Sequence, residues 1–193
     1  MKTTLITRKE NIVFSIIDLI NEIGLKELSI KEIAKRENIT EAAIYKHFKS
    51  KDEMLLEVLN YYSKYDNNIY NTIENSTETE KQKIIASLDL LSQYFESYPA
   101  LTSVYMSYSV LLYEEIISEK LKEIHSKRIN FINSLIKNGQ LSGNISNNIT
   151  AENLTDILVG TYGRIISKWR FSNYSFSLKE KTVEVVSNIL NLL

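Results

Sequence analysis

The chain has 193 residues, of which 44% are apolar and 24% charged, as expected for one or two globular domains with a sizeable core. It contains no cysteine and only two histidines, which excludes a disulfide framework and thiolate ligation, so we expect no metal and no cofactor. Residues 1–51 hold ten basic and seven acidic side chains, a net charge of +3, whereas residues 52–193 hold thirteen and seventeen, a net charge of −4. A basic front on an acidic body indicates phosphate binding at one end.

The first predicted helix begins after Thr7, because Thr7 and Glu10 have the spacing of a capping box. It ends at Gly24, since glycine commonly stops a helix. Its apolar stripe consists of Val13, Ile16, Ile17, Ile20 and Ile23. We expect this helix to brace the two that follow.

Residues 29–51 have the dimensions of a helix-turn-helix. A capping box at Ser29 and Glu32 predicts a short helix, and Asn38 lies where the chain must turn, since asparagine tolerates the left-handed conformation. Thr40 is the next predicted N-cap, and Ser50 with Glu53 begins a further helix at residue 51. This spacing is typical of a DNA-reading motif.

Residues 41–48 form the predicted reading helix. Ile44 and Phe48, four positions apart, should face inward and leave the other side free for a partner. The residues most suited to meeting base edges are Ala42, Ala43 and Lys46, since lysine bonds guanine acceptors and alanine contacts the thymine methyl. The expected phosphate contacts, which set register, are Ser29, Lys31, Thr40, Tyr45, His47 and Lys51.

Residues 7–59 resemble the N-terminal domain of the TetR family of bacterial regulators. The matching features are Gly24, the pair Ile33-Ala34, the cap Thr40, the segment Tyr45-Lys46-His47-Phe48 and the pair Ser50-Lys51. The sequence departs from the family at Asn38, where glycine is usual, and at Leu19-Ile20, where a small segment containing alanine is usual. The resemblance implies that Tyr45, His47 and Lys51 contact the phosphate backbone of DNA.

Helix signals continue along the chain, and strand signals do not. We expect a helix after Thr77, one from Pro99 through Tyr113, one over 114–137, a loop over 139–148, and two last helices at 151–171 and after Ser177. The fold class is therefore all-α, with about nine helices. We divide it into a helix-turn-helix domain at 1–52 and a helical effector-binding and dimerisation domain at 53–193. No apolar run is long enough for a membrane span, so we expect a cytoplasmic protein with no membrane partner.

The last two helices carry the predicted dimer interface. Their shared feature is an apolar stripe at helical spacing, beside Gly160 and Gly163, whose missing side chains would let a neighbouring helix approach. The interface residues are Leu154, Leu158, Thr161, Ile165, Val183, Val186, Ile189 and Leu190. The alternative is that the stripe is internal core. The resemblance implies a homodimer held by a four-helix bundle from these helices.

Large rings concentrate between the reading end and the last helices, where they form either an effector pocket or an aromatic core. The residues are Tyr94, Phe95, Tyr98, Tyr105, Met106, Tyr108, Tyr113, Phe131, Tyr162 and Trp169. His125 and Arg128 interrupt an apolar face, so they either lie at its wet edge, paired with a glutamate, or form the polar end of the pocket.

These patterns predict a DNA-binding transcriptional regulator. The resemblance implies a homodimeric repressor that leaves double-stranded operator DNA when a small apolar or aromatic effector binds. The alternative is a helical interaction or ligand-carrying module that keeps the fold without a specific DNA target. We expect no enzymatic activity, since the chain shows no pair of catalytic carboxylates and no nucleophile with a base, and Glu114 and Glu115 point in different directions on a helix.

Overall fold

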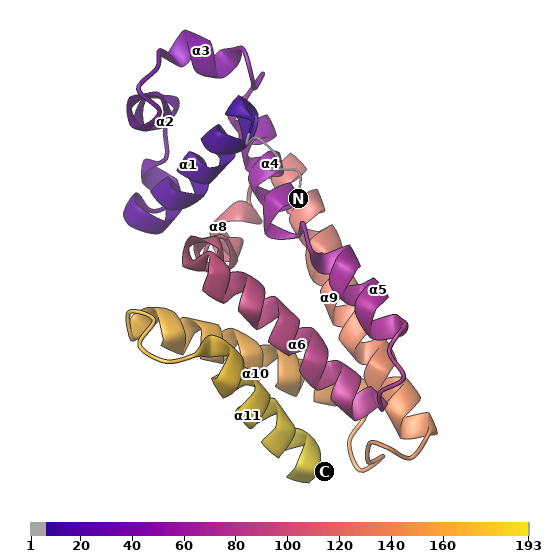
Figure 1. The fold of residues 1–193 in the computed structure, drawn as a ribbon. Coiled ribbons are helices and arrows are strands. Elements are labelled where there is room, and N and C mark those ends of the chain that lie inside the picture. The colour runs from indigo at the N-terminus through magenta and orange to yellow at the C-terminus, as the bar shows by residue number, and fades with distance from the viewer. Residues whose placement is uncertain (1–6, 193) are drawn as a thin grey trace, which may run out of the picture. The chain divides into compact units, whose positions relative to one another are not determined.

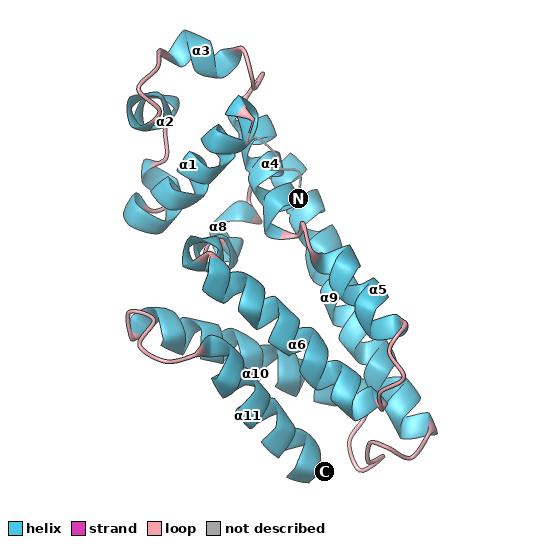
Figure 2. Ribbon diagram, viewed as in Figure 1, coloured by secondary structure: helices cyan, strands magenta, loops and turns pink. Residues whose placement is uncertain are grey.

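The computed structural model describes residues 7–192, and all regular structure in that range is helical (Figure 2). The all-α prediction is confirmed. Contacts divide the chain into two compact units. The first holds the described residues up to Lys64 together with Pro99–Glu123, and the second holds Tyr65–Tyr98 and the described residues from Ile124 onward.

The first unit contains the N-terminal helices and a short middle segment, and Figure 1 labels several of their helices. Its elements are α1 (Arg8–Ile23), η1 (Leu25–Glu27), α2 (Ile30–Arg36), α3 (Glu41–Tyr45), α4 (Lys51–Tyr62), η2 (Pro99–Leu101), α7 (Thr102–Met106), α8 (Tyr108–Leu111) and the start of α9 (Glu115–Leu141). Helix α1 is central, because it contacts α2, α4, η2 and α7. Its buried face includes Ile12, Ile16 and Ile17, which have no exposed surface.

The predicted N-caps are confirmed in this unit. Thr7 and Glu10 form both bonds of a capping box. Ser29, Thr40 and Ser50 each accept a hydrogen bond from the backbone N–H three residues later. Such bonds satisfy amides that a helix start leaves without an internal partner, which explains why α2, α3 and α4 begin where they do.

The second unit consists of α5 (Asp66–Glu74), α6 (Glu80–Ser97), the rest of α9, α10 (Ala151–Phe171) and α11 (Leu178–Leu192). Helices α6 and α11 pack side by side (Figure 1). Buried polar groups join these helices to α10, since the Ser92 hydroxyl lies 3.3 Å from that of Tyr162 and 3.2 Å from that of Thr182. The three residues are buried, so their hydroxyls satisfy one another within the core.

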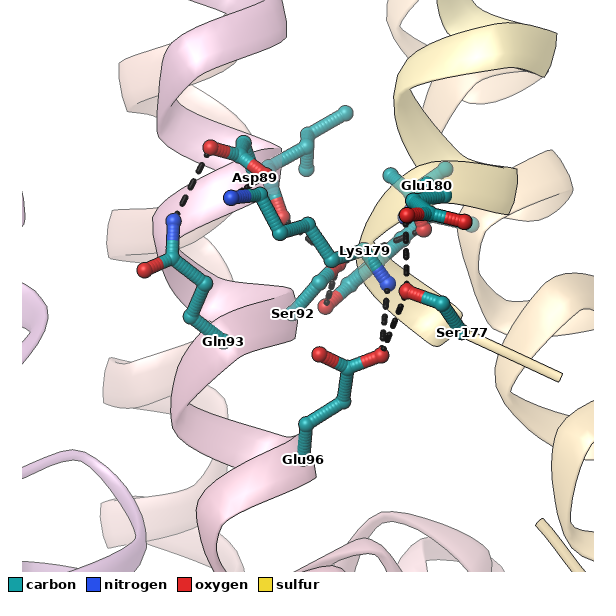
Figure 3. A network of polar contacts seen from close by, with 10 residues as sticks. Asp89, Ser92, Gln93, Glu96, Ser177, Lys179 and Glu180 are labelled. Atoms are coloured by element: carbon teal, nitrogen blue, oxygen red, sulfur yellow. Dashed lines mark hydrogen bonds and ion pairs between the residues drawn. The ribbon is translucent and has the colours of Figure 1, made fainter.

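Polar side chains of α6 also hold the start of α11 (Figure 3). The Glu96 carboxylate accepts from the Ser177 hydroxyl at 2.9 Å and from the Lys179 N–H at 3.1 Å. Ser177 in turn accepts from the Glu180 N–H, as its predicted capping role requires. A carboxylate at a helix N-terminus is stabilised by the partial positive charge there. Glu96 is therefore a cap supplied by a different helix.

Several predicted boundaries were wrong. The helix expected after Thr77 begins at Glu80, because Thr79 and Gln82 form the capping box instead. The helix expected over 99–113 is divided into η2, α7 and α8, where the Ser103 and Ser107 hydroxyls bond nearby carbonyls and Ser107 leaves the helical conformation.

The loop expected from residue 139 begins later, because α9 continues to Leu141. Gly139 lies inside this helix for a packing reason. A Cβ at this position would lie 2.6 Å from the Ile145 side chain, which folds back against the helix. The glycine therefore marks a close approach rather than a helix end. Helix α5 was missed altogether, although Ile69 and Ile73 bury its apolar side.

Candidate nucleic-acid interface

Helices α2 and α3 are joined by a turn whose geometry depends on Asn38. This residue has φ of 53°, the left-handed conformation that the sequence predicted. The Ile39 N–H donates to the Ala34 carbonyl at 3.0 Å, which closes the end of α2. Thr40 then caps α3 by accepting from the Ala43 N–H. Asparagine thus serves the turn where the family usually has glycine.

Residues 41–48, which we call the reading segment, have a buried side and an exposed side. Ile44 is fully buried and Phe48 is 1% exposed, so these two side chains anchor the segment as predicted. Ala42, Lys46 and His47 are exposed, Tyr45 is 52% exposed and Ala43 is half-buried. Helix α3 ends at Tyr45, earlier than predicted, and residues 46 and 47 continue as a turn. The base-reading candidates therefore lie on the accessible side.

The other phosphate candidates lie at helix starts. Ser29, Lys31 and Thr40 are exposed. The hydroxyl oxygens of Ser29 and Thr40 accept capping bonds from their own helices, and each O–H is still able to donate. The Lys51 ammonium donates to the Leu28 carbonyl at 2.9 Å, which ties the start of α4 to the start of α2. An ammonium has three N–H donors, so this bond leaves capacity for a phosphate.

Some basic side chains of the N-terminal basic region, residues 1–51, have a structural role. Arg36 bonds Glu22 through two guanidinium nitrogens, at 2.7 and 3.0 Å, and lies 3.5 Å from Asp18, so it fastens α2 to α1. This arginine holds the pKa of the Glu22 carboxyl below its ordinary value. Arg8 and the Ser15 hydroxyl both bond Glu37, which ends α2. These pairs hold the motif on α1.

The exposed lysines include three that motif reasoning left out, namely Lys26, Lys35 and Lys49. Their signal lay in the charge count of residues 1–51, which marks the region as basic but does not say which side chains face outward. Because phosphate attraction depends on accumulated charge, these three belong among the candidate contacts.

The predicted effector residues fall into both units. In the first, the Tyr108 and Tyr62 hydroxyls lie 3.0 Å apart, and Tyr105 packs on Tyr108 with ring centroids 5.3 Å apart. Burial raises the pKa of Tyr105. Met106 is exposed and Tyr113 is 90% exposed, so these two side chains face solvent in the described residues.

In the second unit, Arg128 forms a two-pronged ion pair with Asp66, with N–O distances of 2.8 and 2.9 Å. The partner of Arg128 is thus an aspartate and not the expected glutamate, and its role in a pocket stays a prediction. The Phe131 ring packs on the Tyr70 ring, with centroids 4.4 Å apart, and burial raises the pKa of Tyr70 to about 12. His125, one turn before Arg128, is exposed.

The remaining aromatic candidates of this unit are mostly core. Tyr162 and Trp169 are buried, and the Trp169 indole donates to the Phe176 carbonyl at 2.7 Å. Tyr98 is half-buried and ends α6. Tyr94 differs, because it lines a surface groove of about 390 Å³ between α5 and α6. Its ring packs edge-on against Tyr65, with centroids 4.7 Å apart.

The predicted dimer interface combines buried and partly exposed residues of α10 and α11. Five of its residues are buried within the single chain: Leu154, Leu158, Ile165, Val186 and Leu190. Thr161, Val183 and Ile189 are partly exposed. The buried part of the stripe packs in the core of the single chain, and the interface itself stays a prediction.

Two protein-family models match the chain. Residues 15–58 match the model described as bacterial regulatory proteins of the tetR family, which spans α2, α3 and most of α4. Residues 62–192 match the model for the C-terminal region of YsiA-like proteins. The chain belongs to the TetR family.

Relatives and solved structures agree with this assignment. The nucleoid occlusion factor SlmA of Vibrio cholerae is 22% identical over 167 residues, which cover 83% of this chain and 85% of SlmA. The ketosteroid regulator KstR2 of Mycobacterium tuberculosis superposes with a TM-score of 0.84 at 16% identity, covering 97% and 95% of the two chains. FadR of Bacillus subtilis in complex with stearoyl-CoA gives 0.73 at 17% identity, covering 91% and 96%. At these identities the structures show the fold.

As a TetR-family member, the chain is a DNA-binding transcriptional regulator, and its helix-turn-helix is the interface with DNA. The family models and the regulators above point to regulation rather than catalysis. None of the helices formed by residues 7–192 combines the length and apolar character that a membrane span needs. Within the same range, no group of three or more metal-binding side chains is arranged around a common point.

Proposed function

We propose that this TetR-family chain is a cytoplasmic, homodimeric repressor without catalytic activity, which releases its operator when a small apolar or aromatic effector binds. The observation that carries the proposal is the division of the reading segment into a buried and an exposed side. The buried side chains of Ile44 and Phe48 anchor the reading segment in the core, and Lys46 is exposed between Tyr45 and His47. A segment held in this way can enter a major groove without unfolding.

The proposed DNA contacts follow the sequence prediction. Ala42, Ala43 and Lys46 read bases, and Ser29, Lys31, Thr40, Tyr45, His47 and Lys51 hold phosphates. The domain division at residues 52 and 53 belongs to the same proposal. It lies inside the first turn of α4, just after the residue that ties α4 to α2.

For the effector, we propose the groove between α5 and α6 as one contact surface. Its volume of about 390 Å³ lies within the range of ligand pockets, and Ile69, Leu90 and the rings of Tyr65 and Tyr94 supply apolar walls. FadR, which shares the fold, is described in complex with stearoyl-CoA, so an acyl chain is a suitable class of apolar effector to test. The other aromatic and polar candidates named from the sequence, from Tyr98 to Trp169, remain predictions for this role.

The dimer interface that we propose lies on the exposed side of α10. Ile157 is 44% exposed there, and Gly160, Thr161 and Arg164 follow at helical spacing. A Cβ at Gly160 would meet nothing within 4 Å in the single chain. Mid-helix glycine costs about 1 kcal/mol relative to alanine, so a glycine that its own chain does not require is best explained by a second helix approaching closely.

The proposal is tested by gel-shift titration on the DNA upstream of the chain's own gene, at several salt concentrations between about 50 and 200 mM. We expect sequence-specific binding whose logarithm falls linearly with the logarithm of salt, because each neutralised phosphate releases counterions. Absence of any salt-dependent DNA binding would contradict the proposal and favour a helical interaction or ligand-carrying module.

Stearoyl-CoA is then added to the preformed complex, and ligands that copurify with the protein are identified by native mass spectrometry. An effector that favours a conformation with the wrong spacing between reading heads shifts the population away from the DNA-bound state. A tenfold loss of operator affinity requires about 1.4 kcal/mol of differential binding. Operator binding that is unchanged by stearoyl-CoA and by any copurified ligand contradicts the effector part alone.

A further inference from the structure

Lys9 occupies an unfavourable place for a cation, and its surroundings compensate. It lies in the first turn of α1, where the helix dipole disfavours positive charge. Its ammonium donates to the Glu57 carboxylate at 2.6 Å and lies 3.8 Å from that of Glu53. The hydrogen bond to Glu57 raises the pKa of Lys9, and the same bond lowers that of Glu57. Both groups are therefore charged at neutral pH.

The same side chains hold the end of the reading segment. The Lys9 ammonium lies 5.2 Å from the centroid of the Phe48 ring, a cation–π distance. Glu53 accepts from the Lys49 N–H at 2.7 Å through its other oxygen. We call Lys9, Phe48, Glu53 and Glu57 the Lys9 cluster. It fastens both the last buried side chain of the segment and the backbone that follows to α1 and α4.

The cluster is unsuited to binding phosphate. Two carboxylates neutralise Lys9, so a phosphate brought to it would meet net negative charge. The three charged side chains are also between 33% and 40% exposed, and ion pairs at such sites add little to the stability of the fold. The cluster instead acts on the local geometry of the chain. Its contacts hold the Phe48 ring and the Lys49 backbone, which directly follow Lys46 and His47.

We propose that Lys9 is a positioning residue for operator recognition, which orients the end of the reading segment through Phe48, Glu53 and Glu57 without touching DNA. This inference rests on the operator binding proposed above. Its consequence is that Lys9 affects specific binding and leaves sequence-independent binding alone. A lysine that contacts phosphate affects both.

The first test compares Lys9→Met with Lys31→Met by titration on operator and on random DNA. Lys9→Met should lose roughly tenfold in operator affinity, which corresponds to about 1.4 kcal/mol, and keep its random-DNA affinity and salt slope. Lys31→Met, at a predicted phosphate contact, should lose affinity on both DNAs and about 0.9 in slope. Lys9→Arg keeps the positive charge and should retain most of the operator affinity. The charge control is Lys122→Met, because Lys122 is an exposed lysine of α9.

Glu57→Gln gives a second and opposite test. It removes a negative charge, so attraction to phosphate alone predicts tighter operator binding, whereas the positioning role predicts weaker binding because the bond that holds Lys9 is weakened. Circular dichroism melts establish that each variant is folded. Weaker operator binding by both Lys9→Met and Glu57→Gln, with unchanged random-DNA binding, supports the inference.

Three results would overturn it: unchanged operator affinity in Lys9→Met, equal losses on operator and random DNA, or tighter operator binding by Glu57→Gln. Failure of the wild-type chain to bind its operator would overturn the inference together with the proposed function. Normal wild-type binding combined with normal Lys9→Met binding would overturn the positioning role alone.

Discussion

Burial separates two roles among the residues between Thr40 and Lys49. Ile44 and Phe48 are buried, and each such side chain contributes about 1.5–3 kcal/mol by leaving water. Lys46 is exposed and contributes little to the fold. Substitutions on the exposed side should therefore alter DNA binding while the protein stays folded, whereas truncation of Phe48 should damage the fold itself.

At the residue scale, Lys46→Ala and Lys31→Ala should differ in kind. Lys46→Ala should relax the preference for one base position and cost about 1–3 kcal/mol on the operator, because a base-edge contact is lost. Lys31→Ala should weaken binding to all sequences alike and lower the salt slope by about 0.9. Competition gel shifts against operator variants measure both effects. Equal behaviour of the two variants would remove one of them from its assigned role.

Helix α11 shows how one element depends on another. Its first turn is capped by its own Ser177 and by Glu96, which comes from α6, 81 positions earlier in the chain. Asp89 of α6 lies 4.0 Å from the Lys179 ammonium beside the same turn (Figure 3). The cap therefore specifies how α6 and α11 meet, in addition to satisfying amides at the start of α11.

At the element scale, Glu96→Ala should lower the free energy of unfolding by about 1 kcal/mol, the usual cost of losing a helix cap. Glu96→Gln should cost less, because an amide oxygen still accepts the two hydrogen bonds. The matched control is Gln93→Ala on the same helix, since Gln93 is exposed and its amide donates to Asp89. Urea unfolding followed by circular dichroism measures the three variants. A loss in Gln93→Ala equal to that in Glu96→Ala would contradict the capping role.

The whole molecule combines a basic reading end with an acidic body, and a dimer places two reading ends on one duplex. Paired reading helices meet successive major grooves when they are about 34–36 Å apart. The surface that pairs the subunits therefore influences DNA affinity without contacting DNA. On this chain the exposed side of α10 at Gly160 is the candidate for that surface, because its other side is already core.

At this scale, Gly160→Leu should convert the dimer to a monomer and weaken operator binding, because a bulky side chain keeps the second α10 at a distance. The single chain has room for it, so the fold should persist. Light scattering after size exclusion gives the mass, and Asn130→Leu on the exposed side of α9 is the control. A Gly160→Leu protein that stays dimeric would move the interface elsewhere.

The helix-turn-helix was predictable from sequence because its signals are local. Ser29, Thr40 and Ser50 cap helices through bonds to amides three residues away, and Asn38 supplies a backbone conformation of its own. The inward position of Ile44 and Phe48 follows from a spacing of four. Boundaries failed where one local signal had more than one interpretation, as at Gly139, which the sequence marked as a helix end but which lies inside α9, where the Ile145 side chain leaves no room for a Cβ.

The sequence by itself determined the all-α class, the family and the exposed side of the reading segment. Only the tertiary structure decided which side of α10 is core, that Glu96 caps α11, and that Lys9 is paired with Glu57. The reason is physical. Periodicity shows that a helix has an apolar face and caps show where it begins, but neither shows which distant side chains that face or that charge will meet.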